Sequence, residues 1–424
     1  MRLAKFALTG AAAALVTTGT FGAGAALAQT DTVKVGVIYP LSGPVAQAGK
    51  DSLAAVEAAV DVVNNKHDFN MPLASTEGLP NLGGAKIELV VGDHQGKPEL
   101  GRADAERLIT QENVVALIGA YHSSVSAAAS NVAERMEVPF LTGESSSPEL
   151  TERGLKWFFR TGPHDGHYTA VMFDFIEQLK KEKGIQVETA GILHEDTEFG
   201  ANSGREQREL AKKHDIEVVA DLPYRSKTTA LTSEVQRLKA AQPDVLFPTS
   251  YTSDAMLLIR TMKELDYNPD LVIAQNAGFN DPTFIETMGK DAEGVISRAP
   301  FALDMADRIP LINDLDELYK KHSGGRAIFD PPIRSFTGAL VLFDAINRAG
   351  STDPEKIRQA LVETDIPASQ LALPWEGVAF GPDGQNTKVS AVLTQIQGGR
   401  YWSVYPFDVA AKDLIYPFPD WDER

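Results

Sequence analysis

Two hydroxyl-rich segments of this sequence could bind a small acidic group. They read GAYHSS (residues 119–124) and TGESSS (142–147). Each follows a short apolar run and precedes a helical pattern, so its hydroxyls and free backbone N–H groups meet at the start of a helix. A carboxylate or another small acceptor suits such a position. The alternative is that these serines only cap their helices.

The second half of the chain offers different chemistry at comparable positions. The segments HEDTEFG (194–200), TSYTSD (249–254) and QNAGFN (275–280) each follow an apolar run. They supply Phe199 and Tyr251 as aromatic walls, and Gln275 and Asn276 as polar groups. An aromatic residue in a loop more often packs than recognises a ligand. It is therefore the position of these residues, directly after predicted strands, that indicates a role in binding. Open α/β sheets bind ligands at the carboxyl ends of their strands.

Sequence motifs for catalysis are missing. The chain has no G-x-S-x-G elbow, no H-E-x-x-H and no G-x-x-x-x-G-K-[ST] phosphate loop. It has no cysteine, which removes thiolate nucleophiles and thiolate metal sites. His164 and His167 are spaced for a metal, but the start of a surface helix is the simpler interpretation. We therefore expect no enzyme, no catalytic residues, no metal and no cofactor.

The elements that would position these residues alternate between strand and helix. Apolar runs at 33–39, 87–91, 114–118 and 138–141 predict buried strands, with amphipathic helices between them. The alternation restarts after Arg160, with strands at 190–193, 216–220, 245–247 and 271–274. Helices are expected at 167–181, 200–214, 230–240, 253–265, 312–321, 335–348 and 354–362, before a strand-rich tail from Val378. The pattern predicts an α/β protein with two doubly wound lobes, and the tail suggests a return across their boundary.

The amino-acid composition argues against one class of function, and the N-terminal pattern predicts a location. The 424 residues carry 58 acidic and 40 basic side chains, a net charge of −18, which argues against nucleic-acid binding. Arg2 and Lys5 precede an uncharged stretch that closes on Ala26-Leu27-Ala28. This pattern predicts a secretory signal peptide (1–28) cleaved before Gln29, and hence an exported protein.

The mature chain resembles the leucine/isoleucine/valine-binding proteins of branched-chain amino-acid ABC importers. The resemblance is carried by VKVGVIYPLSGPVAQAG (33–49) and PFLTGESSSPELTERG (139–154), with HEDTEFG, GKDAEGV (289–295) and FGPDG (380–384) following in family order. It implies the type I periplasmic binding protein fold, with a multi-strand hinge. Lobe 1 would comprise 29–162 plus 301–378, and lobe 2 would comprise 163–300 plus 379–424. The implied partners are a small ligand and the membrane permease of an importer, and the implied location is the periplasm. We expect a monomer.

The resemblance also assigns site residues. The family's carboxylate-binding serine falls on Ser123, and the hydroxyl that grips both ends of the amino acid falls on Ser146. Glu144 takes the position that offers a backbone carbonyl to the ammonium. Phe199 and Tyr251 fall on aromatic positions of the second lobe. Ala277 stands where the family has an acid for the ammonium, with Gln275 and Asn276 beside it.

That departure leaves the ligand open. The Glu144 side chain could supply the missing charge, which keeps an amino acid or a related small polar ligand. Alternatively the acid is missing because the ligand carries no ammonium, as with an amide or an aromatic acid. The Glu144 side chain could also point to solvent, with only its backbone lining the site. A periplasmic sensor subunit would use the same lobes, and an exported hydrolase is least supported.

Overall fold

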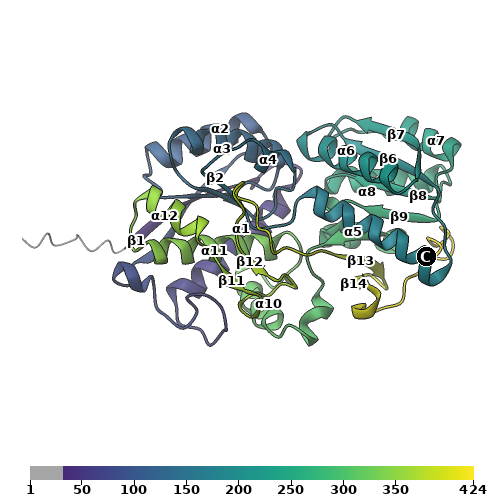
Figure 1. Ribbon diagram of the computed structural model, residues 1–424. Helices are drawn as coiled ribbons and strands as arrows, with labels where there is room; N and C mark the ends of the chain where they lie inside the picture. The colour runs from purple at the N-terminus through teal and green to yellow at the C-terminus, as the bar shows by residue number, and fades with distance from the viewer. Residues whose placement is uncertain (1–31) are drawn as a thin grey trace, which may run out of the picture.

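Two α/β lobes lie side by side in the computed structural model, which describes residues 32–424 (Figure 1). The prediction of two doubly wound lobes is confirmed. The predicted signal peptide lies outside the described residues. No helix within residues 32–424 is long and apolar enough to cross a membrane.

The first lobe is built on a parallel sheet in the order β2-β1-β3-β4-β5. Its strands are β1 (Thr32–Tyr39), β2 (Lys86–Asp93), β3 (Leu117–Gly119), β4 (Phe140–Thr142) and β5 (Phe158–Arg160). Its helices are α1 (Ala46–Asn64), α2 (Pro98–Thr110), α3 (Ser123–Arg135), α4 (Glu149–Glu152), α10 (Leu311–His322), α11 (Pro332–Ala349) and α12 (Pro354–Val362). Because parallel strands point the same way, the polar segments after β3 and β4 emerge at one edge of the sheet.

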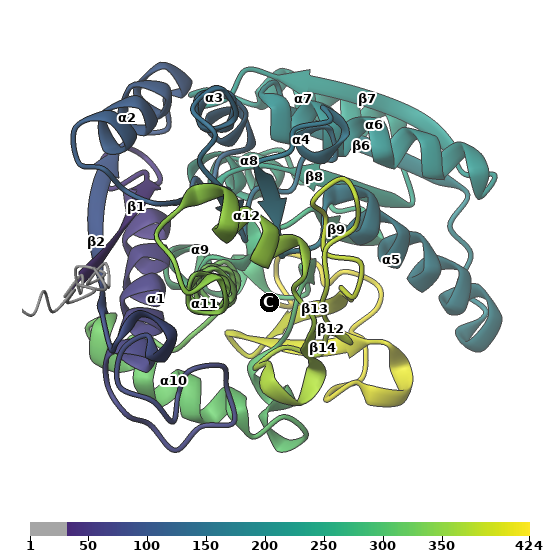
Figure 2. The same cartoon turned by 60° about the vertical axis from the view of Figure 1, so that its left-hand side comes forward.

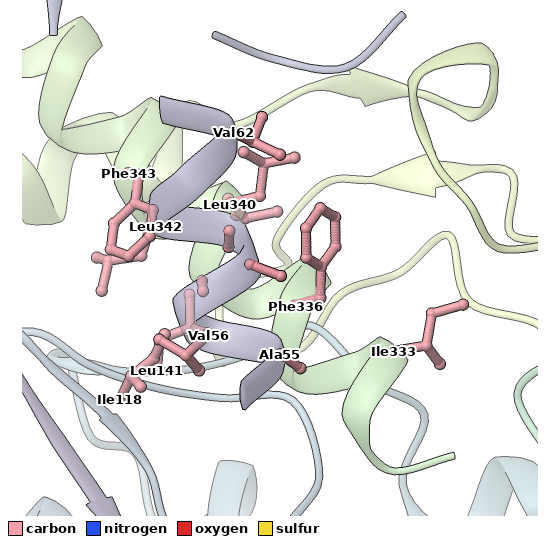
Figure 3. Packing of buried hydrophobic residues seen from close by; sticks show 14 of the residues in the cluster. Ala55, Val56, Val62, Ile118, Leu141, Ile333, Phe336, Leu340, Leu342 and Phe343 are labelled. Atoms are coloured by element: carbon pink, nitrogen blue, oxygen red, sulfur yellow. The ribbon is translucent and has the colours of Figure 1, made fainter. Parts of the chain in front are cut away.

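The core of this lobe joins two helices that lie far apart in the sequence. Helix α1 presents Val56, Ala59 and Val63 at helical spacing, and all three are fully buried. They pack with α11, whose Phe336 and Leu340 arrive from a segment almost 300 residues later (Figures 2 and 3). Burying a side chain of this size contributes about 1.5–3 kcal/mol. The first lobe is therefore completed only after the chain has built most of the second.

The second lobe contains a seven-stranded sheet in the order β14-β13-β10-β9-β8-β6-β7. Its strands are β6 (Thr189–Glu195), β7 (Glu217–Tyr224), β8 (Val245–Thr249), β9 (Leu271–Ala274), β10 (Ile296–Ala299), β13 (Val392–Gln397) and β14 (Arg400–Tyr405). Its helices are α5 (Asp165–Gln178), α6 (Glu198–Lys213), α7 (Thr232–Ala241), α8 (Thr252–Glu264) and α9 (Pro282–Met288). Strands β6 to β10 are parallel, whereas β13 and β14 form an antiparallel edge.

Within residues 32–424 the chain passes between the lobes three times: from β5 to α5, from β10 to α10, and from β12 (Gly377–Val378) to β13. β12 pairs with β11 (Ile366–Pro367) in a small separate sheet. The first and third crossings are tied together, because the Arg160 N–H donates to Gly384 O at 2.8 Å and Asn386 N–H donates to Arg160 O at 2.9 Å. The yellow-green C-terminal segment in Figure 1 follows the third crossing. This arrangement forms the multi-strand hinge expected from the strand-rich tail.

The structure departs from the sequence expectations mainly at short strands. Strand β3 begins three residues later than the apolar run at 114–118 suggested. Strands β5 and β10 were not predicted at all. Both carry a buried arginine inside a short run, which interrupts the apolar signal.

Candidate ligand-binding cleft

A small cavity lies between the two lobes, at the carboxyl ends of β3, β4, β8 and β9. Its lining residues are Tyr121, Ser123, Glu144, Ser146, Pro331 and Arg334 from the first lobe, and Phe199, Tyr251, Ala277 and Arg298 from the second. Five of the seven predicted site residues are therefore brought together. The cavity measures about 20 Å³, room for a single water. A ligand of several atoms can occupy it only if the lobes separate or side chains move.

On the first-lobe wall, hydrogen bonds between the two serine segments hold them together. Ser145 Oγ donates to Tyr121 O at 3.2 Å, and Ser123 Oγ accepts the Ser147 N–H at 3.2 Å. In the described chain, neither α3 nor α4 receives a capping bond from a side chain. The serines therefore join two strand ends rather than cap helices. This leaves Ser123, at the start of α3, and Ser146, between β4 and α4, lining the cavity.

Glu144 has a buried side chain, so it does not point to solvent. Its Oε1 accepts the Tyr39 hydroxyl at 2.9 Å, and its Oε2 accepts the Thr142 hydroxyl at 3.4 Å. Burial, together with this carboxylate, raises the pKa of Tyr39 well above its ordinary value, so Tyr39 stays a donor. Both Glu144 oxygens thus already have partners on the first lobe.

Arg334, at the start of α11, was not predicted from the sequence. It forms an ion pair with Asp330, and its Nη1 donates to Glu144 O at 2.8 Å and to Gly143 O at 3.3 Å. The backbone carbonyl that the family resemblance assigned to an ammonium therefore already accepts a bond from a cation. An arginine that follows two prolines, in the segment after the second lobe crossing, gives no local signal of a site.

The second-lobe wall is largely aromatic. Tyr251 occupies the turn between β8 and α8, and Phe199 lies in the first turn of α6. Their ring centroids are 5.4 Å apart, and Tyr251 also lies 4.9 Å from His122 and 6.0 Å from Tyr121 across the cleft. This cluster gives the closed lobes an apolar contact worth about 0.5–1.5 kcal/mol per pair beyond burial.

Gln275 and Asn276 follow β9 as predicted, but neither lines the cavity. Gln275 Nε2 donates to Asp165 Oδ1 and to Thr169 Oγ1, each at 3.3 Å. Asn276 donates to Asp330. The backbone takes positive φ at Asn276 (68°) and Ala277 (54°), which turns this segment and leaves Ala277 at the wall. The two amides lie behind the wall, next to the charged side chains.

Arg298, within β10, is the residue that the sequence reasoning missed most clearly. It lines the cavity although it is 1% exposed. Burial lowers the pKa of its guanidinium, and Tyr168 and Asp165 partly offset that effect. Inspection of strand ends could not find it, because it lies inside a strand. The available signal was a charged residue within an otherwise apolar run.

Two further cavities lie between the lobes. One of about 160 Å³ shares Tyr251 and is bordered by His122, Ser124, Lys227 and Asp254. Another of about 620 Å³ lies along the second crossing, with Phe301, Phe329 and Trp402 among its walls. The cavity of about 160 Å³ also carries hydroxyls, from Thr197, Ser226 and Ser253, but neither of these two cavities is lined by Ser123 or Ser146.

The histidine pair considered for a metal has a structural role. His164 is the N-cap of α5, and its Nδ1 accepts the Gly166 N–H at 3.0 Å. Among residues 32–424, no group of three or more His, Asp or Glu side chains is placed to hold a metal ion.

Comparisons with known proteins agree with this architecture. The sequence profile of the periplasmic binding protein family matches residues 32–400. The Leu/Ile/Val-binding protein homolog 7 of Brucella suis is 28% identical over 404 residues, covering 93% of this chain and 96% of that protein. The leucine-binding protein LivK of Thermotoga maritima superposes with a TM-score of 0.76 at 22% identity, covering 89% of this chain and all of that one.

A solute-binding protein of Rhodopseudomonas palustris, solved in complex with 4-hydroxybenzoate, superposes with a TM-score of 0.72 at 20% identity. It covers 92% of this chain and 99% of that one. At such identities the solved structures show the fold, while the profile match shows the family. This chain therefore belongs to the periplasmic binding protein family, with the two-lobed α/β fold of its Leu/Ile/Val-binding relatives.

Proposed function

We propose that this protein is the extracytoplasmic solute-binding component of an ABC importer. It captures an amino acid or a related small polar ligand between its lobes and delivers it to a membrane permease. The observation that carries the proposal is the cavity at the strand ends, which is lined from both lobes by hydroxyls, aromatic rings and charged groups. The profile match and the Leu/Ile/Val-binding relatives support the same class.

Capture would begin on the first lobe. Ser123 and Ser146 offer hydroxyls beside the start of α3, where backbone N–H groups are free of intrahelical partners. A ligand carboxylate placed there gains charge-assisted hydrogen bonds and a favourable interaction with the helix dipole. Phe199 and Tyr251 would then cover the apolar part of the ligand from the second lobe.

Release and uptake would depend on the hinge. A ligand that touches both lobes shifts the population toward the closed arrangement, because only that arrangement offers all of its contacts at once. The cavity of about 20 Å³ supports this mechanism, since an amino acid cannot enter it without opening. Export to the periplasm, with the signal peptide 1–28 removed, is proposed on the sequence pattern that ends at Ala28.

A second ligand class has its own support. Tyr121, Phe199 and Tyr251 place three aromatic rings around the cavity, and the second-lobe wall has no carboxylate among its described lining residues. An aromatic acid would stack on such rings and would need no ammonium partner.

A thermal-shift screen tests the proposal. Protein stripped of bound ligand is mixed with amino acids, amides and aromatic acids, and its melting is recorded. A ligand at 100 times its Kd adds about 2.7 kcal/mol of stability. Stabilisation by one member without turnover supports a receptor. No response to any member, or chemical conversion of one of them, contradicts it.

A further inference from the structure

Arg298 is a buried cation with too few partners. Its Nη2 lies 3.4 Å from Asp165 Oδ1 and 3.5 Å from Ser146 Oγ, both long for charge-assisted bonds. Nε and Nη1 are buried and have no hydrogen-bond partner among residues 32–424. The guanidinium stacks 3.5 Å above the Tyr168 ring, which holds its plane in place. Buried donors without acceptors are costly, so this cation needs an acceptor in the cleft.

The other charged groups at the cavity are better satisfied. Tyr39 and Thr142 donate to the Glu144 carboxylate, and Arg334 is paired with Asp330 and two carbonyls. Asp165 Oδ2 also has no partner within the described chain, but Asp165 does not line the cavity, whereas Arg298 does. The hydrogen-bond donors without partners at the cleft therefore belong to a cation, Arg298.

The position of Arg298 connects it to the acid-binding side of the cleft. Its Nη2 reaches across from the second lobe to Ser146 Oγ on the first, the hydroxyl that the proposed function assigns to the ligand. A carboxylate bound by Ser123 and Ser146 would therefore also lie within reach of the unpartnered guanidinium nitrogens. Arginine suits this role because its planar fork matches a carboxylate.

We propose that Arg298 is the residue that sets ligand class, by donating from the second lobe to the carboxylate that Ser123 and Ser146 receive from the first. The two lobes then close on the ligand's anionic group, and the ligand needs no ammonium. The inference rests on the proposed function and deepens it. It explains how a wall with Ala277 in place of an acid can still contribute an electrostatic contact.

Matched probes separate the carboxylate from the amine. L-leucine is compared with 4-methylpentanoate, which lacks the ammonium, and with 3-methylbutylamine, which lacks the carboxylate. 4-Hydroxybenzoate is compared with 4-hydroxybenzamide. Calorimetry on wild-type protein is expected to show binding by at least one acid without an ammonium, and none by the amine or the amide. Binding of the amine or the amide in preference to its acid overturns the inference.

Variants then test the residue itself. Arg298→Gln is expected to weaken the bound acid by about ten- to a hundredfold, and Arg298→Lys, which keeps the charge, should recover part of that loss. Asp165→Asn removes the neighbouring negative charge and should leave acid binding equal or tighter. Arg358→Gln, on α12 at the surface ion pair with Glu355, is the control for loss of a distant arginine.

The outcomes separate a failure of the role inferred for Arg298 from a failure of the proposed function. If acids bind wild type but bind Arg298→Gln equally well, Arg298 is not the determinant and the proposed function stands. If Asp165→Asn weakens binding as much as Arg298→Gln, the pair acts only as a structural unit and the inference fails. If no probe binds and the wider screen is also silent, the proposed function fails, and the inference fails with it. Melting curves of each ligand-free variant confirm that the comparison is made on folded protein.

Discussion

Two arginines near the cleft, one in each lobe, are at most 1% exposed, and their side chains are bonded very differently. Arg160 ends β5, and its Nε donates to Gln385 Oε1 at 2.6 Å. Its Nη1 donates to Ser147 O at 2.6 Å and Ser145 O at 3.2 Å, and its Nη2 donates to Thr151 Oγ1 at 3.0 Å. Among residues 32–424, the hydrogen-bonding contacts of the Arg298 guanidinium in β10 are the two long ones of its Nη2.

The difference shows how a buried charge can serve structure or binding. Arg160 holds the backbone of residues 145–147 from behind, which fixes Ser146 before any ligand arrives. Its bonds are made within the protein, so it has little left to offer a ligand. Arg298 has donors left over, so the second-lobe wall gains its bonds when the cleft is filled. The binding residues of the first lobe are held in position before a ligand binds, whereas Arg298 in the second lobe gains hydrogen-bond acceptors when the ligand binds.

The largest expected effect is a loss of stability at the first-lobe wall of the cleft. Arg160→Met leaves the Ser145 carbonyl without this donor, removes one of the two donors to Ser147 O and breaks the bonds to Gln385 and Thr151, so it should lower the free energy of unfolding by about 3 kcal/mol or more. Denaturant melts of ligand-free protein measure this loss. Arg358→Met, which removes a surface ion pair, should change stability by less than about 1 kcal/mol. Similar stability of the two variants would show that Arg160 does not organise the wall.

Acid should destabilise the first lobe through a buried histidine. Burial lowers the pKa of His94 to about 4, while its Nδ1 accepts the Gly96 N–H at 3.0 Å and its Nε2 lies 3.0 Å from Ala120 O. A histidine whose folded pKa is depressed stabilises the fold above its unfolded pKa of about 6.5, and that stability is lost as the pH falls. The loss should approach the order of 3 kcal/mol near pH 4.

Burial also lowers the pKa of His167 in α5 to about 4, and it lowers the pKa of His164 at the N-cap of that helix further, so the second lobe also loses stability as the pH falls. Burial raises the pKa of Asp165, whose protonation works in the opposite direction and offsets part of this loss. Melting temperatures recorded from pH 7 to pH 4 should therefore fall. A melting temperature that stays constant over this range would contradict the account of these buried histidines.

Two neighbouring serines, Ser145 and Ser146, offer a matched test of the first-lobe wall of the cleft. Ser146→Ala removes a hydroxyl that faces the cavity, and it should weaken ligand binding about ten- to a hundredfold with little change in melting. Ser145→Ala removes a hydroxyl that bonds to Ser126 at 2.7 Å and to Tyr121 O at 3.2 Å, and it should lower stability while affecting affinity less. The opposite pattern in calorimetry and melting would mean that Ser146 only supports the fold.

The smallest effect is expected at Glu144 if the ligand is an acid without an ammonium. Glu144→Gln removes a negative charge that Tyr39 and Thr142 already satisfy, so affinity should stay equal or rise slightly. An amine ligand that used this carboxylate would instead lose about 2 kcal/mol or more. Calorimetry with the identified ligand separates these cases, and a large loss for an acid would contradict the account of the first wall.

Sequence reasoning was most successful where local patterns are strong. Helix α12 (Pro354–Val362) and strand β9 (Leu271–Ala274) were predicted with their observed bounds, because proline and apolar runs mark them clearly. The serine segments were placed at the cleft by the rule that polar residues after parallel strands meet at one edge.

The remaining site residues depend on tertiary packing. Arg298 and Ser146 are separated by 152 positions along the chain and meet only after the lobes close. Gln275 and Asn276 satisfy the strand-end rule, yet positive φ at Asn276 and Ala277 leaves their side chains behind the wall. Neither the Arg298–Ser146 contact nor the placement of these two amides can be predicted from the spacing of residues along the chain.

Closure on the ligand can be measured directly, because the chain has no native cysteine to interfere with labelling. Lys97 and Arg225 are exposed on opposite lobes, next to Gly96 and Ser226, which border the same cavity between the lobes. Spin labels on the Lys97→Cys, Arg225→Cys double variant report the distance between the lobes. Adding the acid that gives the largest thermal shift should shorten and narrow that distance distribution. An unchanged distribution, with calorimetry showing the same ligand bound, would contradict a receptor that closes its two lobes on a small ligand.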